Sequence, residues 1–172
     1  MSDDADIAAW LSGRLPQDWF ETAPAVSVDR EEIVVTGRLA VPESTEGGDG
    51  TGSGATRRAE AGRVARFREE TRPARMRIAD EAESLFGRKV AWGAACGQTE
   101  ELFTNLATPV MTRLRQPQRQ VLDTLVDAGV ARTRSEALAW CVRLVGQHQR
   151  DWIESLREAL AGVEEARAAG PA

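Results

Sequence analysis

A single strand-like segment, residues 108–114, is followed by two helix-like segments and by no further strand. Its side chains alternate between two faces, with Val110 and Leu114 on one and Met111 and Arg113 on the other. A strand without a neighbour leaves its backbone donors and acceptors unpaired along both edges, and such groups must be satisfied wherever they are buried. The sequence therefore predicts that this segment needs a pairing partner.

Two amphipathic helices are predicted after this segment. The first begins near Pro117, because amide groups in the first helical turn have no partner within the helix and the missing amide of a proline is no loss there. It ends at Gly129. The second begins at Thr133, which forms a capping box with Glu136 three residues later. The apolar positions predicted to be buried are Val121, Leu122, Leu125 and Val126 in the first helix and Ala137, Leu138, Cys141, Val142 and Val145 in the second.

Strand, helix, glycine-containing turn, the run TRSEAL and a second helix together resemble the ribbon-helix-helix family, which includes the Arc and MetJ repressors. The resemblance covers residues 108–148, and the sequence departs from it at Gln118 and Arg119, where the family often has apolar residues. It implies a homodimer in which segments 108–114 of two copies pair antiparallel about a two-fold axis.

The resemblance also implies contacts to nucleic acid from the strand and from the start of the second helix, where amide groups hold phosphates. Arg113 is expected to read a guanine through two hydrogen bonds, and one polar reader per strand predicts low sequence specificity. In the alternative interpretation the ribbon only dimerises and its arginines are solvated. The residues implied in contact with nucleic acid are Met111, Arg113, Arg115, Arg132, Thr133, Arg134 and Ser135.

The first part of the chain has the pattern of a mixed α+β domain. A helix over residues 6–11 and a hairpin over residues 25–41 are predicted, followed by a flexible linker or loop over residues 42–56 that is rich in Gly, Ser and Thr. Residues 57–104 are expected to pack with residues 1–41. They contain two helices divided by Pro73, at about 57–71 and 73–86, and a strand over 88–96. A connector over 97–107 with a short helical turn follows this strand.

The element order α, β, β, α, α, β resembles that of a type II KH domain, an RNA-binding fold. The GxxG loop by which that family holds the nucleic-acid backbone is missing. A plain α+β domain with its helices packed on a three-stranded sheet is the alternative. The complete prediction is an α+β chain, with an αββ(αα)β domain followed by a ribbon-helix-helix over residues 105–172 whose last helix is extended.

Charge is distributed unevenly along the chain, although the formal net charge is only −5. Residues 1–50 contain three arginines and eleven acidic residues, whereas residues 57–77 contain eight arginines and three glutamates. The arginine-rich helix is a candidate for additional phosphate contacts, because each neutralised phosphate adds salt-dependent affinity. The secondary basic cluster consists of Arg57, Arg58, Arg63, Arg66 and Arg68.

Few residues are available for enzyme chemistry. The sequence has one histidine and two cysteines and lacks a phosphate-binding glycine motif, so no catalytic set, metal or cofactor is expected. Neither a membrane span nor a charged-then-apolar leader is recognisable, which makes the cytoplasm the expected compartment. Two functions remain open. The first is a dimeric transcriptional or chromosome-associated regulator that binds DNA, with RNA as a second candidate ligand. The second is a protein-interaction or dimerisation module whose acidic first 50 residues engage a protein partner.

Overall fold

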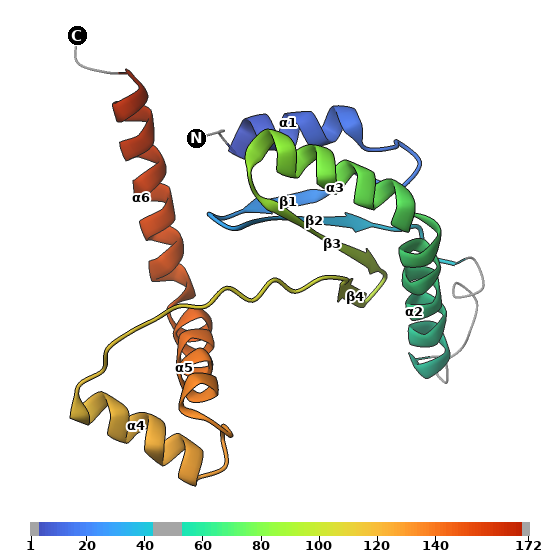
Figure 1. Ribbon diagram of the computed structural model, residues 1–172. Helices are drawn as coiled ribbons and strands as arrows, with labels where there is room; N and C mark the ends of the chain where they lie inside the picture. The colour runs from blue at the N-terminus through green and yellow to red at the C-terminus, as the bar shows by residue number, and fades with distance from the viewer. Residues whose placement is uncertain (1–3, 43–52, 170–172) are drawn as a thin grey trace. The chain divides into compact units, whose positions relative to one another are not determined.

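The structure is a computed structural model that describes residues 4–42 and 53–169 (Figure 1). It is a mixed α+β protein and divides into two compact units, Met1–Pro109 and Val110–Ala172. All strands of the described residues lie in the first unit, and helices are the only regular elements in the described part of the second unit. No helix within the described ranges is long and apolar enough to cross a membrane.

A four-stranded mixed sheet forms the centre of the first unit, with the strand order β1-β2-β3-β4. The outer pairs β1–β2 and β3–β4 are antiparallel hairpins, whereas the central pair β2–β3 is parallel and is connected through two helices. The strands are β1 (Ala25–Val28), β2 (Glu32–Arg38), β3 (Lys89–Cys96) and β4 (Thr99–Leu102). The predicted hairpin and the predicted strand over 88–96 are confirmed.

Three helices accompany this sheet: α1 (Asp4–Arg14), α2 (Ser53–Glu70) and α3 (Arg72–Phe86). Figure 1 shows α1 and α3 lying over the sheet, and the ion pair between Arg14 and Glu81 joins these two helices. Thr71 separates α2 from α3, and Pro73 stands in the first turn of α3, as the position of the proline predicted.

The core of the first unit lies between the helices and one face of the sheet, in two adjoining clusters. The first cluster brings α1 and α3 onto β2 and β3, because period-2 apolar positions of the strands meet period-3.6 positions of the helices. The second brings α2 onto β3. The buried members are Ile7, Leu11, Leu15, Ile33, Val35, Ile78 and Trp92 in the first cluster and Leu39, Val64, Phe67, Ala94 and Cys96 in the second.

The predicted connector after β3 is wrong in one respect: β4 replaces the expected helical turn. The polypeptide reverses at Gly97, whose φ of 57° is accessible to glycine at little cost. Glu60, a buried residue of α2, then accepts hydrogen bonds from the Gln98 amide (3.2 Å) and the Thr99 hydroxyl (2.8 Å). These contacts fix the turn against the helix and leave β4 extended beside β3.

One further expectation differs from the structure. Residues 53–56 of the predicted linker belong to α2, because extending a helix that is already packed costs less than starting one; residues 43–52 lie outside the described residues. On α3 the apolar side chains of Met76 and Leu85 are exposed, whereas Arg75 lies inward with Ile78 and Ala82.

The second unit consists of α4 (Gln116–Asp127), α5 (Arg134–His148) and α6 (Arg150–Ala169). The last helix was predicted to be continuous, but it is interrupted at Gln149, where ψ of 28° departs from helical geometry. In the described part of the second unit, the buried apolar side chains are Leu122, Ala131 and Ala137. This core is small for the described length of the unit.

Candidate nucleic-acid interface

Residues 104–115 carry neither helix nor strand. The predicted strand over 108–114 is thus absent from a single copy of the chain. None of the strands in the described residues pairs with this segment. Val110 and Met111 are among its most exposed side chains, at 86% and 97% of their full accessible areas. The segment presents an open backbone and apolar side chains to its surroundings.

Arg113 and Arg115 lie on this segment with exposed side chains. Neither forms an ion pair within residues 4–42 and 53–169. The end of the segment is held by α4, since the Gln118 side chain accepts a hydrogen bond from the Arg115 amide at 2.8 Å. Arg119 donates to the Leu114 carbonyl at 2.7 Å, and Leu114 packs on the small core. Two uncommitted positive charges thus stand next to a fixed helix start.

The start of α5 has the predicted cap. The Thr133 hydroxyl accepts a hydrogen bond from the Glu136 amide at 3.2 Å, which confirms Thr133 as the N-cap residue. The returning bond of the box is displaced by one residue, since the Glu136 carboxylate accepts from the Arg132 amide at 2.9 Å rather than from Thr133. Ser135 is exposed at the same helix start.

The two arginines of this helix start are engaged by carboxylates of their own unit. Arg134 makes two hydrogen bonds to Asp123, and Arg132 lies 3.4 Å from Glu136. The hydrogen bonds from Arg134 lower the pKa of Asp123, and those from the backbone and side chain of Arg132 lower the pKa of Glu136. Both acids are therefore charged at neutral pH, and a phosphate at this site would compete with them.

Around the small core, apolar side chains predicted to be buried in α4 and α5 are exposed in a single copy of the chain. Apolar side chains of α6 are exposed as well. Exposed aliphatic and aromatic side chains in this number are typical of a surface that another molecule covers. The residues concerned are Val121, Val142, Val145, Trp152, Leu156, Leu160 and Val163.

The secondary basic cluster lies on α2, but the structure does not gather it on one face. At 100° per residue, positions 57, 58, 63, 66 and 68 are spread over more than half of the helix circumference. Arg68 forms an ion pair with Glu101 of β4 at 2.8 Å, and Arg63 is partly buried. A continuous phosphate-binding stripe along α2 is therefore not formed by these five arginines.

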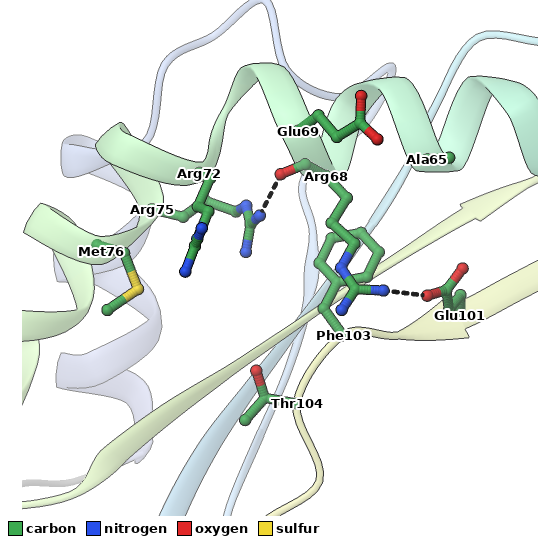
Figure 2. Close-up of a pocket in the computed structure, with 9 residues that line it drawn as sticks. All are labelled: Ala65, Arg68, Glu69, Arg72, Arg75, Met76, Glu101, Phe103 and Thr104. Carbon is green, nitrogen blue, oxygen red and sulfur yellow. Dashed lines mark hydrogen bonds and ion pairs between the residues drawn. The ribbon is translucent and has the colours of Figure 1, made fainter.

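A pocket of about 600 Å³ opens where α2 meets α3 and β4 ends (Figure 2). Figure 2 shows Arg72 and Arg75 at one end of this pocket and the ion pair of Arg68 with Glu101 at the other. Burial lowers the pKa of Arg75, and the positive charges of Arg68 and Arg72 lower it further. The lining residues are Ala65, Arg68, Glu69, Arg72, Arg75, Met76, Glu101, Phe103 and Thr104.

Of these pocket residues, the sequence interpretation singled out Arg68 alone as a candidate site residue. A signal for Arg75 was available, because it stands four residues after Thr71 and three before Ile78, on the inward stripe of α3. A charged residue in that position predicts either a buried ion pair or a binding site.

The chain is similar to two protein families, one for each unit. Residues 5–102 match the family described as "Rv1265-like protein, N-terminal domain", and residues 115–167 match the one described as "Mb1296 C-terminal domain". The segment between the two matches, residues 103–114, contains the predicted strand. Neither description is that of a ribbon-helix-helix or KH family.

Two relatives align with almost the whole chain. "Uncharacterized protein Rv1265" of Mycobacterium tuberculosis and "Uncharacterized protein Mb1296" of Mycobacterium bovis are each 57% identical to it over 169 residues. The alignment covers 98% of this chain and 72% of each relative. No solved structure matches the chain.

Proposed function

Since the chain belongs to the family of Rv1265-like proteins, we propose for it the role of a dimeric nucleic-acid-binding protein. The second unit would pair with that of another copy and bind DNA with low sequence specificity, in a transcriptional or chromosome-associated role. RNA is a second candidate ligand. The proposal makes no use of enzyme chemistry, and it places the binding surface on residues 108–135.

The observation that carries this proposal is the open segment 104–115 beside a core of three buried side chains. A unit of this size with so few buried apolar side chains is expected to be only marginally stable alone, and oligomerisation is one way in which such units become stable. Pairing of segments 108–114 from two copies would satisfy the backbone groups and cover Val110. The exposed apolar residues of α4 and α5 would then form a shared core.

Nucleic acid is the favoured ligand of such a dimer because the paired segments would carry two copies of Arg113 and Arg115. These arginines have no acidic partner in the part of the chain that the structure describes. Phosphates would attract them with a strong dependence on salt, whereas Arg113 alone offers few donors for reading base edges. Low sequence specificity is expected because most contacts would go to phosphates and few to base edges.

The alternative, a dimerisation or protein-interaction module that binds no nucleic acid, is favoured by one specific observation. Arg132 and Arg134, which the ribbon-helix-helix resemblance assigns to phosphates, are held by Glu136 and Asp123. In that case the acidic first 50 residues would engage a basic partner protein.

The two functions are separated by fluorescence anisotropy of the full chain with random duplex DNA, single-stranded DNA and RNA, each titrated with salt. Arg113→Ala is expected to weaken duplex binding and to lower the slope of log K against log salt by about 0.9 for each phosphate that the variant no longer neutralises. Sedimentation equilibrium of the same variant is expected to give an unchanged dimer.

Arg30→Ala is the matched control, because Arg30 is an exposed arginine in the β1–β2 turn of the first unit and has no assigned contact to nucleic acid. It is expected to bind as the unchanged protein does. Equal binding by Arg113→Ala and Arg30→Ala would exclude the assigned surface. A chain that binds none of the three nucleic acids at low salt would support the interaction module instead.

A further inference from the structure

Arg75 is a buried cation that pairs with no carboxylate among the residues that the structure describes. It is 5% exposed, and its two hydrogen bonds go to neutral oxygens: Nε donates to the Thr71 hydroxyl at 2.9 Å, and Nη2 donates to the Arg68 carbonyl at 2.6 Å. Its guanidinium also lies 4.9 Å from the centre of the Phe103 ring. A buried charge is costly unless an opposite charge accompanies it, so this arrangement is incomplete in energetic terms.

A structural role accounts for part of this arrangement. The bond to the Arg68 carbonyl satisfies one of the acceptors at the end of α2, where a positive charge is also favourable. The bonds to Thr71 and Arg68 together occupy Nε and one proton of Nη2. The Nη1 group donates to no residue within the described ranges, although the guanidinium fork offers five donors. The outer edge of the fork is therefore available to a ligand.

The free edge of Arg75 lies in the pocket at the α2–α3 junction, together with Arg72 and Arg68. Arg72 is exposed and forms no ion pair with any residue in 4–42 or 53–169, whereas Arg68 is shared with Glu101. The other acid that lines the pocket, Glu69, does not oppose them either, because Figure 2 shows its carboxylate pointing away from Phe103. Two arginines without acidic partners thus converge on one cavity.

The cavity has the dimensions and walls of a small-molecule site. Its volume of about 600 Å³ falls in the range of roughly 300–1,000 Å³ found for ligand pockets. Phe103 and Met76 supply apolar surface, and the arginines supply donors. Arg75 is recessed, and a duplex surface would meet exposed arginines first. The shape therefore fits a small molecule better than a nucleic-acid backbone.

We propose that the pocket at the α2–α3 junction binds a small molecule through an oxyanion, a phosphate or carboxylate group that Arg75 and Arg72 hold. The bound anion supplies the negative charge that Arg75 lacks, and planar guanidinium groups match both phosphate and carboxylate through paired hydrogen bonds. This site shares no residue with the proposed nucleic-acid interface over residues 108–135, since every lining residue lies between Ala65 and Thr104.

Isothermal titration calorimetry of the full chain tests the proposal, with inorganic phosphate and citrate as probes at constant ionic strength in sodium chloride. At least one anion is expected to bind saturably, and which of them does so distinguishes a phosphate ligand from a carboxylate ligand. Arg72→Gln is expected to weaken that binding by about tenfold or more, because hydrogen bonds to charged groups are individually strong. Arg75→Gln is expected to weaken it at least as much.

Arg77→Gln is the control, because Arg77 is exposed on the same helix but does not line the pocket. It is expected to bind the anion as the unchanged protein does. Circular dichroism identifies loss of folding in Arg75→Gln, and the exposed Arg72 keeps the test valid in that event. Binding of neither anion, or equal weakening by Arg72→Gln and Arg77→Gln, would overturn the proposal. Competition of duplex DNA with the bound anion would also overturn it, in favour of a nucleic-acid site.

Discussion

The guanidinium group of Arg134 lies across the carboxylate of Asp123, with Nε 2.6 Å from Oδ1 and Nη2 2.8 Å from Oδ2. The pair joins the first residue of α5 to α4 across the intervening turn. The same two hydrogen bonds lower the pKa of Asp123 and raise the pKa of Arg134, so the two shifts agree. The pair lies at the surface, where a competing phosphate can reach it.

Asp123→Asn is expected to strengthen binding to nucleic acid. Removal of the negative charge releases Arg134 for phosphate binding, and each additional phosphate neutralised on duplex DNA steepens the slope of log K against log salt by about 0.9. Anisotropy titrations at several salt concentrations measure this slope. Asp127→Asn is the matched control, because Asp127 is an exposed acid on the same helix without an ion pair in the described residues. Equal slopes in the two variants would show that Arg134 does not touch nucleic acid.

Arg134→Gln is expected to raise the pKa of Asp123 towards its ordinary value of about 3.9. A carboxyl whose pKa is lowered in the folded state stabilises the fold above its ordinary pKa, and that contribution is lost as the pH falls through the lowered value. The window in which the pair weakens is therefore acidic, and the ion pair persists at neutral pH. A carbon-13 NMR titration of the Asp123 carboxyl reports the change, with Asp127 in the same spectra as reference. An unchanged midpoint for Asp123 would assign its lowered pKa to another group.

Gly97→Ala and Gly87→Ala form a matched pair that isolates the role of Glu60. Both glycines have positive φ, at 57° and 68°, so each alanine introduces backbone strain of about 1–2 kcal/mol. A Cβ at Gly87 meets open space, whereas one at Gly97 overlaps the Glu60 carboxylate. Glu60 would have to give up its bonds to Gln98 and Thr99.

We therefore expect urea unfolding of the first unit to show a larger loss of stability for Gly97→Ala. The excess should be about 1–3 kcal/mol, the cost of leaving a buried hydrogen-bonding group unsatisfied. Losses of the same size in both variants would mean that displacing the Glu60 carboxylate from Gln98 and Thr99 does not destabilise the fold.

The elements that the sequence predicted correctly depend on local rules. Alternation in residues 25–41 indicates a hairpin, and Pro73 divides two helices because it cannot donate to the preceding turn. β4 could not be predicted from its composition, since Thr99–Leu102 contains two glutamates and no β-branched apolar residue. The usable signal was the two-residue turn that begins with Gly97, a position at which tight hairpins favour glycine.

Long-range relationships were beyond a local interpretation. The parallel pairing of β2 with β3 depends on how α2 and α3 pack, which no periodicity encodes. The pocket was missed for the same reason, because Phe103 follows β4 and reaches the α2–α3 junction only through the sheet. At the candidate interface, the cap at Thr133 was predictable from residues three apart, whereas the partner of Arg134 lies eleven residues away on another helix.

Thr133→Ala is expected to destabilise the start of α5. The Thr133 hydroxyl accepts the Glu136 amide, and loss of such a cap costs about 1 kcal/mol, within a range of roughly 0.5–2. Hydrogen exchange measured by mass spectrometry over residues 134–148 should accelerate accordingly at one fixed protein concentration. Ser135→Ala is the control, because Ser135 stands in the same turn and makes no capping bond to a described residue. Equal exchange rates in the two variants would contradict the assignment of the cap.

Val110→Asp is expected to convert the dimer into monomers. Val110 is 86% exposed in a single copy, and in the proposed pairing it faces the shared core. A carboxylate at that position would be desolvated in each copy, and this cost opposes association. Sedimentation equilibrium over a range of concentrations measures the change. Val41→Asp is the matched control, since Val41 is an exposed valine of the first unit, and it should leave the dimer intact. The first unit should keep its sheet in both variants, because its core contains no residue of the second. A dimer that survives Val110→Asp, or a protein that is already monomeric, would remove the basis for a nucleic-acid surface that two copies share.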